Sequence, residues 1–419
     1  MGTAGSSSKV EQFMRKGIRI LNPSTVTIGE EVALNRISGD GVVLHPGCTI
    51  LGPNTLIMAK CEIGCEGPVT IENCQLGPLV KLNGGYFSQS TFLDKVSFGL
   101  GAHVRAGCLL EEAANGSHAV GLKQTILFPF VTLGSLINFC DCLMAGGTSR
   151  KNHSEVGSSY IHFNYTPDQD KATPSLIGDV PRGVMLNQKP IFLGGQGGLV
   201  GPMRLGYGTV IAAGTIYRKD FPQGDGLLFA GSTLKRQHSL HPGLYHGIKR
   251  IIANNMNYIA SIIALRRWYS DVRSLFLGSD PMEKSLHEGA VEKLEMIIAE
   301  RIKRLGEVAE KMPRSIEVYR AVMKDRALEH QVRLRREFLE HWPRIEEFLT
   351  GSLDKTGDPE KRDNFLNIVL KGMDAKGGDY VRVIQGIDRA GAETGTQWLQ
   401  GLVDEVNSKA LGLIPAFSR

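Results

Sequence analysis

Apolar residues recur every six positions through the first half of the chain. Three runs keep this spacing: Leu51, Ile57, Ile63 and Val69; Phe98, Val104 and Leu110; and Leu193, Leu199, Leu205, Ile211 and Tyr217. A glycine often follows the apolar residue directly, as in Leu51-Gly52 and Leu193-Gly194. An amphipathic helix repeats at three and four residues, and a half-buried strand repeats at two. The period of six therefore predicts a repeating unit made of one short strand and one tight turn.

Three such units close into one triangular coil, in which the apolar side chains point inward and glycine relieves the backbone at the bends. Residues eighteen apart then lie one above the other, and stacked coils bury a continuous apolar column. We expect a parallel β-helix over residues 14–220, preceded by a flexible leader over residues 1–13. The register breaks in segments rich in Gly, Asn, Ser, Asp or Pro, which we expect to be loops extruded from the coil: residues 83–97, 111–122, 144–155 and 164–175.

Helical spacing replaces the period of six after Asp220. Apolar positions from Val291 to Leu305 recur at three and four residues, and similar stripes occupy residues 244–277, 314–341, 360–373 and 380–411. Three Xaa-Pro pairs are expected to separate helices: Asp280-Pro281, Met312-Pro313 and Trp342-Pro343. We therefore predict a linker over residues 221–243 and a C-terminal all-helical domain over residues 244–419.

Composition narrows the class of protein. The net charge of +5 comes without a long Lys/Arg run, which argues against a nucleic-acid partner. The sequence has neither an apolar stretch long enough for a membrane helix nor a signal pattern at its start, so we expect a cytoplasmic protein with no membrane partner. The seven cysteines are scattered, and no second pair gives zinc spacing, so we expect reduced packing residues and no metal.

Two cations have the spacing of one coil. Arg105 and Lys123 are eighteen residues apart, which stacks them on one face of the predicted β-helix. Stacked cations repel each other unless an anion lies between them or a carboxylate neutralises them. A phosphate is the natural candidate, and solvated surface cations are the alternative.

Residues 14–220 resemble the acetyltransferase domain of the bacterial enzymes that combine N-acetylglucosamine-1-phosphate uridyltransferase and glucosamine-1-phosphate acetyltransferase. The segment Gly17-Ile18-Arg19-Ile20-Leu21-Asn22-Pro23 is similar to the entry into that domain, and Ile211-Ala212-Ala213-Gly214-Thr215 is similar to a late coil. The resemblance implies a left-handed parallel β-helix built from hexapeptide repeats, working as a homotrimer. It also implies acetyl-CoA as co-substrate, bound between subunits near Gly195, Ala213 and Arg218.

The resemblance extends to the sugar-phosphate positions. Arg105 and Lys123 match the family's pair of cations, and Asn164-Tyr165 with Lys171 matches its Asn-Tyr loop and the lysine that follows. Thr166-Pro167 departs from the family's Asp-Gly, and Asn-Tyr as a simple turn is the alternative. These residues predict a substrate of the sugar-phosphate or nucleotide-sugar class, of the UDP-N-acetylglucosamine type.

The catalytic base departs from the family pattern. The family carries a histidine twelve positions after the coil lysine, where this chain has Ser135, which cannot act as a base at neutral pH. His153, in an inserted loop, and His162, two residues before Asn164, are candidate replacements; structural histidines are the alternative. We favour His162, because alternate residues of a strand share a face.

Two functions remain open at this point. One is an acyl-CoA-dependent transferase acting on an amino-sugar phosphate or nucleotide sugar, without uridyltransferase activity because no glycine-rich nucleotide-binding loop opens a βαβ unit. The other is a non-catalytic trimer that binds such a ligand and whose helical domain engages a partner.

Overall fold

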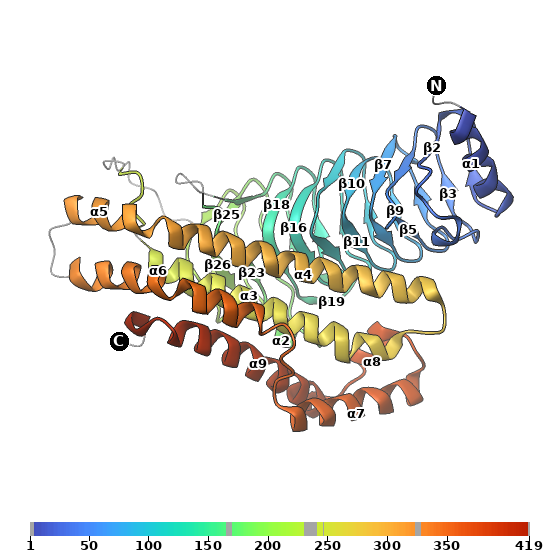
Figure 1. Cartoon of the computed structure of the whole chain (residues 1–419). Coiled ribbons are helices and arrows are strands. Elements are labelled where there is room, and N and C mark those ends of the chain that lie inside the picture. Colours follow the sequence, from blue (N-terminus) through green and yellow to red (C-terminus); the bar gives the residue numbers. More distant parts are fainter. Residues whose placement is uncertain (1–3, 165–169, 230–240, 246, 323–327, 418–419) are drawn as a thin grey trace.

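A computed structural model describes residues 4–164, 170–229, 241–245, 247–322 and 328–417. It confirms the predicted architecture, a parallel β-solenoid followed by a helical region (Figure 1). Of the predicted linker over residues 221–243, residues 230–240 lie outside the described residues. The solenoid itself continues past the predicted boundary at residue 220, because β29 (Leu227–Leu228) pairs with β27 (Val210–Ile211).

The solenoid has three faces, each a ladder of parallel strands. Face A consists of β1 (Arg19–Ile20), β3 (Val43–Leu44), β6 (Glu62–Ile63), β9 (Lys81–Leu82), β12 (Ser97–Phe98), β15 (Asn115–Gly116), β17 (Thr132–Leu133), β21 (Glu155–Val156), β24 (Phe192–Leu193), β27 and β29. Face B consists of β2 (Thr27–Ile28), β4 (Thr49–Leu51), β7 (Val69–Glu72), β10 (Gly85–Ser88), β13 (Ala102–Val104), the first halves of β16 (Gly121–Leu127) and β18 (Asn138–Met144), β22 (Ile161–Phe163), β25 (Gly198–Val200) and β28 (Ile216–Tyr217). Face C consists of β5 (Leu56–Ile57), β8 (Gln75–Leu76), β11 (Ser90–Phe92), β14 (Cys108–Leu110), the second halves of β16 and β18, β23 (Ser175–Ile177) and β26 (Met203–Leu205).

Coil length explains where the predicted loops were wrong. Residues 83–97 hold β10 and β11, and residues 111–122 hold β15 and the start of β16, so both segments are regular coil. The period of eighteen fails there because these coils are shorter: Lys81 pairs with Ser97, sixteen residues later, and Asn115 pairs with Thr132, seventeen residues later. Within residues 144–155 the structure does extrude an antiparallel hairpin, β19 (Gly147–Ser149) and β20 (Asn152–His153).

Close stacking accounts for part of the glycine pattern. A Cβ at Gly157 would meet the backbone nitrogen of Gly195 on the next coil, and a Cβ at Gly194 would meet that of Ala213. Positive φ angles at the corners are often adopted by other residues, among them Ala119 (φ 56°), Leu136 (φ 59°) and Asp141 (φ 59°). The bends therefore depend less on glycine than the sequence pattern indicates.

The N-terminal segment is a helix rather than the predicted flexible leader. Helix α1 (Ala4–Arg15) lies against β2 at the first coil, and its Val10 and Phe13 are buried in the core. These two apolar side chains close the open end of the apolar column, which explains why the segment is ordered.

The helical region follows the solenoid along the chain. Its elements are α3 (Ile248–Asp271), α4 (Pro281–Glu310), α5 (Met312–Val322), α6 (Leu328–Thr350), α7 (Pro359–Lys376), α8 (Tyr380–Gln385) and α9 (Arg389–Gly412), with a shorter α2 (Val180–Gly183) inserted in the solenoid. Asp280-Pro281 separates helices as predicted, because Asp280 caps α4 and Pro281 occupies its first turn. Pro343, in contrast, lies inside α6, so Trp342-Pro343 does not separate helices.

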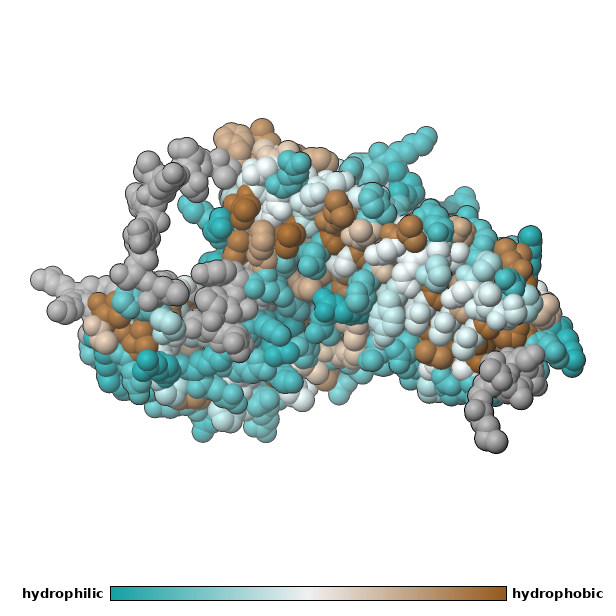
Figure 2. All heavy atoms as spheres, turned by 90° about the horizontal axis from the view of Figure 1, so that it is seen from above, coloured by the Kyte–Doolittle hydropathy of each residue, from teal (hydrophilic) through white to brown (hydrophobic). Residues whose placement is uncertain are grey.

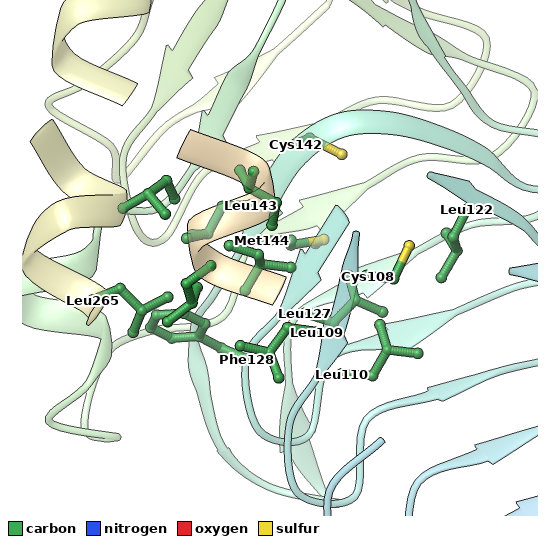
Figure 3. Packing of buried hydrophobic residues seen from close by; sticks show 14 of the residues in the cluster. Cys108, Leu109, Leu110, Leu122, Leu127, Phe128, Cys142, Leu143, Met144 and Leu265 are labelled. Atoms are coloured by element: carbon green, nitrogen blue, oxygen red, sulfur yellow. The ribbon is translucent and has the colours of Figure 1, made fainter. Parts of the chain in front are cut away.

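The helices and the solenoid share one core. Helix α4 packs on β5, β8, β11 and β14 of face C, and a Cβ at its Gly289 would meet the Gln75 side chain of β8. Figure 3 shows Leu265 of α3 beside Phe128 and the buried leucines of the coils; Leu109, Leu143 and Leu265 are each fully buried. Because apolar residues line both sides of the face C strands, this face is buried inside and out.

A cluster of polar residues also lies in the interface between the solenoid and the helices. Tyr269 of α3 donates a hydrogen bond to Glu111 at 2.7 Å, and Arg273 binds Glu112 through both terminal nitrogens at 2.6 and 3.0 Å. The Arg273 guanidinium also lies 3.9 Å from the centre of the Tyr380 ring. The buried charges of the solenoid are thus paired with residues of the helical region. The solenoid and the helices therefore form a single folded unit.

Candidate functional site

Face B carries the predicted cation pair. His103 pairs with Gly121 and Val104 with Leu122, so Arg105 and Lys123 lie side by side on adjacent coils. Lys123 in turn pairs with Cys140 of β18, and Nη2 of Arg105 lies 3.8 Å from the Cys140 sulfur. In the ranges that the structure describes, neither cation is within ion-pair distance of a carboxylate. This leaves an electropositive point on an outer face, which is the environment that a phosphate requires.

The carboxylate of Asp141 lies near Lys123 but forms its ion pair with an arginine of helix α4. Asp141 is almost fully buried at the corner between faces B and C, and its Oδ1 lies 2.8 Å from Nη2 of Arg301 in α4. Asn164 donates a hydrogen bond from Nδ2 to Oδ2 of Asp141 at 3.1 Å. Burial raises the pKa of Asp141, while the charges of Arg301 and Lys123 oppose that rise. Helix α4 thus contributes a buried cation to the site, a contribution that sequence analysis missed.

The same arginine reaches the second predicted substrate segment. Nη1 of Arg301 donates a hydrogen bond to the carbonyl oxygen of Lys171 at 3.3 Å. Asn164 and Lys171 therefore both contact the Asp141–Arg301 ion pair, although seven positions separate them along the chain. Tyr165 lies outside the described residues.

The predicted donor-binding residues form another part of the surface. Corner residues connect from coil to coil through backbone hydrogen bonds, Ser159 to Ser135 at 2.8 Å, Gln196 to Ser158 at 2.8 Å and Gly214 to Gly195 at 2.9 Å. Gly195 and Ala213 lie on this corner, which joins faces A and B. Arg218 and Asn164 line one hollow of about 580 Å³ together with Phe163, Val200 and Ile216.

Neither predicted base shares the outer surface of face B with the cation pair. His153 belongs to the inserted hairpin and lies 3.7 Å from Glu155 of face A. His162 points into the solenoid, since it pairs with the core residue Leu199, and its Nε2 lies 2.7 Å from the hydroxyl of Ser175. His162 is only 3% exposed, and burial lowers its pKa to about 4. Both features disfavour His162 as a base for a substrate bound on the outer face.

The pKa of His162 makes folding stability depend on pH. The unfolded chain protonates this histidine near pH 6.5, whereas the folded chain resists protonation until about pH 4. The unfolded state therefore binds more protons between these values, and stability is lost as the pH falls through this window. We expect wild-type protein to lose roughly 2 kcal/mol between pH 7 and 5 from this group. Urea unfolding at the two pH values should show a smaller difference for His162→Gln, and an unchanged difference would contradict the assignment.

A different histidine lies beside Ser135. The hydroxyl of Ser135 is 2.8 Å from Nδ1 of His118, and both lie on the corner between faces A and B. Seventeen residues separate them, the same interval as that between Lys123 and Cys140. With a fixed coil length of eighteen residues, His118 would not lie beside Ser135. The sequence pattern therefore did not indicate this contact.

Comparison with known proteins agrees with the solenoid geometry. The N-terminal half of the chain is similar to bifunctional GlmU proteins. It is 29% identical over 215 residues to "Bifunctional protein GlmU" of Thermotoga petrophila, covering 51% of this chain and 42% of the relative. The GlmU protein of Synechococcus elongatus is 29% identical over 214 residues, with the same shares covered. The chain thus spans less than half the length of the curated relatives it matches, and no family model matches it.

These findings confirm the resemblance for the N-terminal half. The matched share corresponds to the solenoid, a hexapeptide-repeat β-helix of the acetyltransferase-like kind. No described helix is both long enough and apolar enough to cross a membrane. Within the described ranges, no group of His, Cys, Asp or Glu side chains is arranged to hold a metal ion.

Proposed function

We propose that the protein is an acyltransferase-like enzyme that binds an amino-sugar phosphate or nucleotide sugar on face B. The observation that carries this proposal is the stacking of Arg105 and Lys123 on adjacent coils without a carboxylate partner among the described residues. The phosphate would lie between these two cations, and Asn164 would contact the sugar hydroxyls or the N-acetyl group. The anchored chain around Lys171 would flank the ligand.

The resemblance supplies the second substrate. Acetyl-CoA would bind along the corner of Gly195 and Ala213, with Arg218 close to its phosphates. Gly195 and Ala213 are small, so they would leave room for the extended acetyl-CoA molecule along this corner. The hollow lined by Arg218 and Asn164 would connect this donor to the sugar. A non-catalytic trimer that binds the same sugar phosphate, with a partner on its helical region, is the competing function. It is favoured by Ser135, which stands where the family carries its base.

Loss of one cation should weaken ligand binding. Lys123→Ala is expected to reduce the affinity for glucosamine-1-phosphate by about one to two decades, because a charge-assisted contact contributes roughly 1.5–3 kcal/mol. Titration calorimetry measures this change directly. Lys81→Ala is a matched control, since Lys81 lies on face A, 3.3 Å from Glu62. Equal affinities of Lys123→Ala and wild type would remove the pair from the site.

The outer surface of the later coils supports self-association. Phe192, Val210 and Leu227 pair in register on face A and are 41%, 37% and 60% exposed. Figure 2 shows hydrophobic side chains exposed among hydrophilic ones on the upper side of the molecule. Exposed apolar side chains stacked in one row are typical of an interface between subunits. We propose a homotrimer in which this row is buried.

Light scattering tests the proposed trimer. Wild-type protein at micromolar concentration is expected to show three times the monomer mass of 45.7 kDa. Val210→Asp should shift this mass towards the monomer, because it places a charge in the middle of the apolar row. Ser97→Asp, on the same face but nearer the N-terminal coils, is the control. A monomer mass for wild type would rule out the trimer.

A further inference from the structure

The hydroxyl of Ser135 orients the imidazole ring of His118. Ser135 is held in place by its backbone N–H, which donates to the hydroxyl of Ser158 at 3.2 Å. Its own hydroxyl lies 2.8 Å from Nδ1 of His118. No partner of Nε2 of His118 is found in the described part of the chain, and the side chain is exposed at the corner. The serine fixes one ring nitrogen while the other faces outward.

The position of the ring relates it to both predicted ligands. His118 lies on the same coil as Lys123, five residues before it, and Ser135 lies on the coil of Cys140. The imidazole is therefore at the edge of face B that carries the cation pair. Along the corner, the following coils contribute Ser158, then Gly195 and then Ala213, with strands of adjacent coils about 4.8 Å apart. An imidazole at this place lies where a sugar held on face B would meet a donor held along the corner.

We infer that His118 is the general base of this site and that Ser135 orients it. This inference rests on the proposed function. When Nδ1–H donates to the hydroxyl oxygen of Ser135, Nε2 has a free lone pair for the substrate. Nε2 takes a proton from the amino group of the sugar as its nitrogen attacks the carbonyl carbon of the acyl thioester. The new C–N bond forms, the C–S bond breaks, and the imidazolium returns the proton to the departing thiolate.

His118 fits this role better than the buried histidine. An exposed imidazole can approach a ligand on the outer face, whereas His162 is enclosed by the core and bonded to Ser175. The absence of histidine at position 135 is then no loss of function, because the imidazole has moved one coil towards the N-terminus and lies within hydrogen-bond distance of the serine in its place. The serine acts as a positioning residue.

The assignment is tested by assaying acetyl transfer from acetyl-CoA to glucosamine-1-phosphate. The full chain is used, and the rate is measured from the release of the thiol of coenzyme A. His118→Gln is expected to lower kcat about 100-fold or more, with the Kd for glucosamine-1-phosphate unchanged by calorimetry. Ser135→Ala should lower kcat by a smaller factor and shift its pH profile. The double variant His118→Gln/Ser135→His should regain part of the lost rate, because it returns an imidazole to the adjacent coil. His45→Gln, on face A, is the control for histidine loss.

The outcomes separate this inference from the function on which it rests. Wild-type transfer together with full activity of His118→Gln would overturn the base assignment alone. Loss of activity in His162→Gln but not in His118→Gln would do the same. Complete loss of transfer in Ser135→Ala, together with an acyl adduct on Ser135 in mass spectra of wild-type protein, would replace the base by a serine nucleophile. Tight sugar-phosphate binding by wild type without transfer from any acyl-CoA would overturn both the assignment and the enzymatic function.

Discussion

Replacing Leu109 with aspartate is expected to prevent the chain from reaching a stable fold. Leu109 is fully buried on face C, in the row of Gln75 and Thr91 that α4 covers. Removing its side chain in Leu109→Ala should already cost about 2–5 kcal/mol, because a cavity would remain between coil and helix. The aspartate adds the cost of an unpaired charge in the same place. Because the helices and the solenoid share one core, the helices cannot undock without exposing face C to solvent.

Urea unfolding and expression in soluble form measure the effect. Leu109→Ala should move the midpoint to lower urea, and Leu109→Asp should give aggregated or unfolded protein. Thr49→Asp is the matched control, since Thr49 occupies an outward strand position on face B and is only partly buried. Stability of Leu109→Asp close to that of Thr49→Asp would show that face C is not covered in solution.

Removing Arg301 is expected to destabilise the fold and to loosen the candidate site together. Arg301→Met leaves Asp141 buried without its cation, and breaking a buried pair in this way typically costs about 3–5 kcal/mol. The same change removes the hydrogen bond to Lys171 and leaves Asn164 bonded to a carboxylate that is no longer held. Affinity for glucosamine-1-phosphate should therefore fall, even though Arg301 is buried and far along the chain from Arg105 and Lys123.

A second variant separates charge from packing. Arg301→Met/Asp141→Asn removes both charges, so most of the lost stability should return. The destabilisation of Arg301→Met should also shrink at low pH, because protonation of Asp141 removes the unpaired charge. Arg304→Met is the control, as Arg304 pairs with Glu300 and Glu307 within its own helix. Equal stabilities of Arg301→Met and Arg304→Met would show that the Asp141 contact contributes little.

Local and periodic features of this chain were readable from the sequence. The period of six follows from the need of every coil to place an apolar side chain inside, so it predicted the solenoid and the side-by-side placement of Arg105 and Lys123. The helical stripes and the Asp280-Pro281 start of α4 were likewise local signals. Coils of sixteen and seventeen residues broke the assumed interval of eighteen, which produced two false loops and concealed His118 beside Ser135.

Only the tertiary structure decided how the two halves meet. Leu109-Leu110 and Leu143-Met144 lie in strands that are buried on both sides, and no periodicity in the sequence states which helix covers them. Arg301 lies 160 residues after Asp141, and their contact depends on the docking of α4 rather than on any local pattern. The inward direction of His162 is also a matter of coil register, since one residue of shift moves a side chain to the opposite face. Repeats in a sequence specify the neighbours within a solenoid, whereas contacts between solenoid and helices arise from packing across the whole chain.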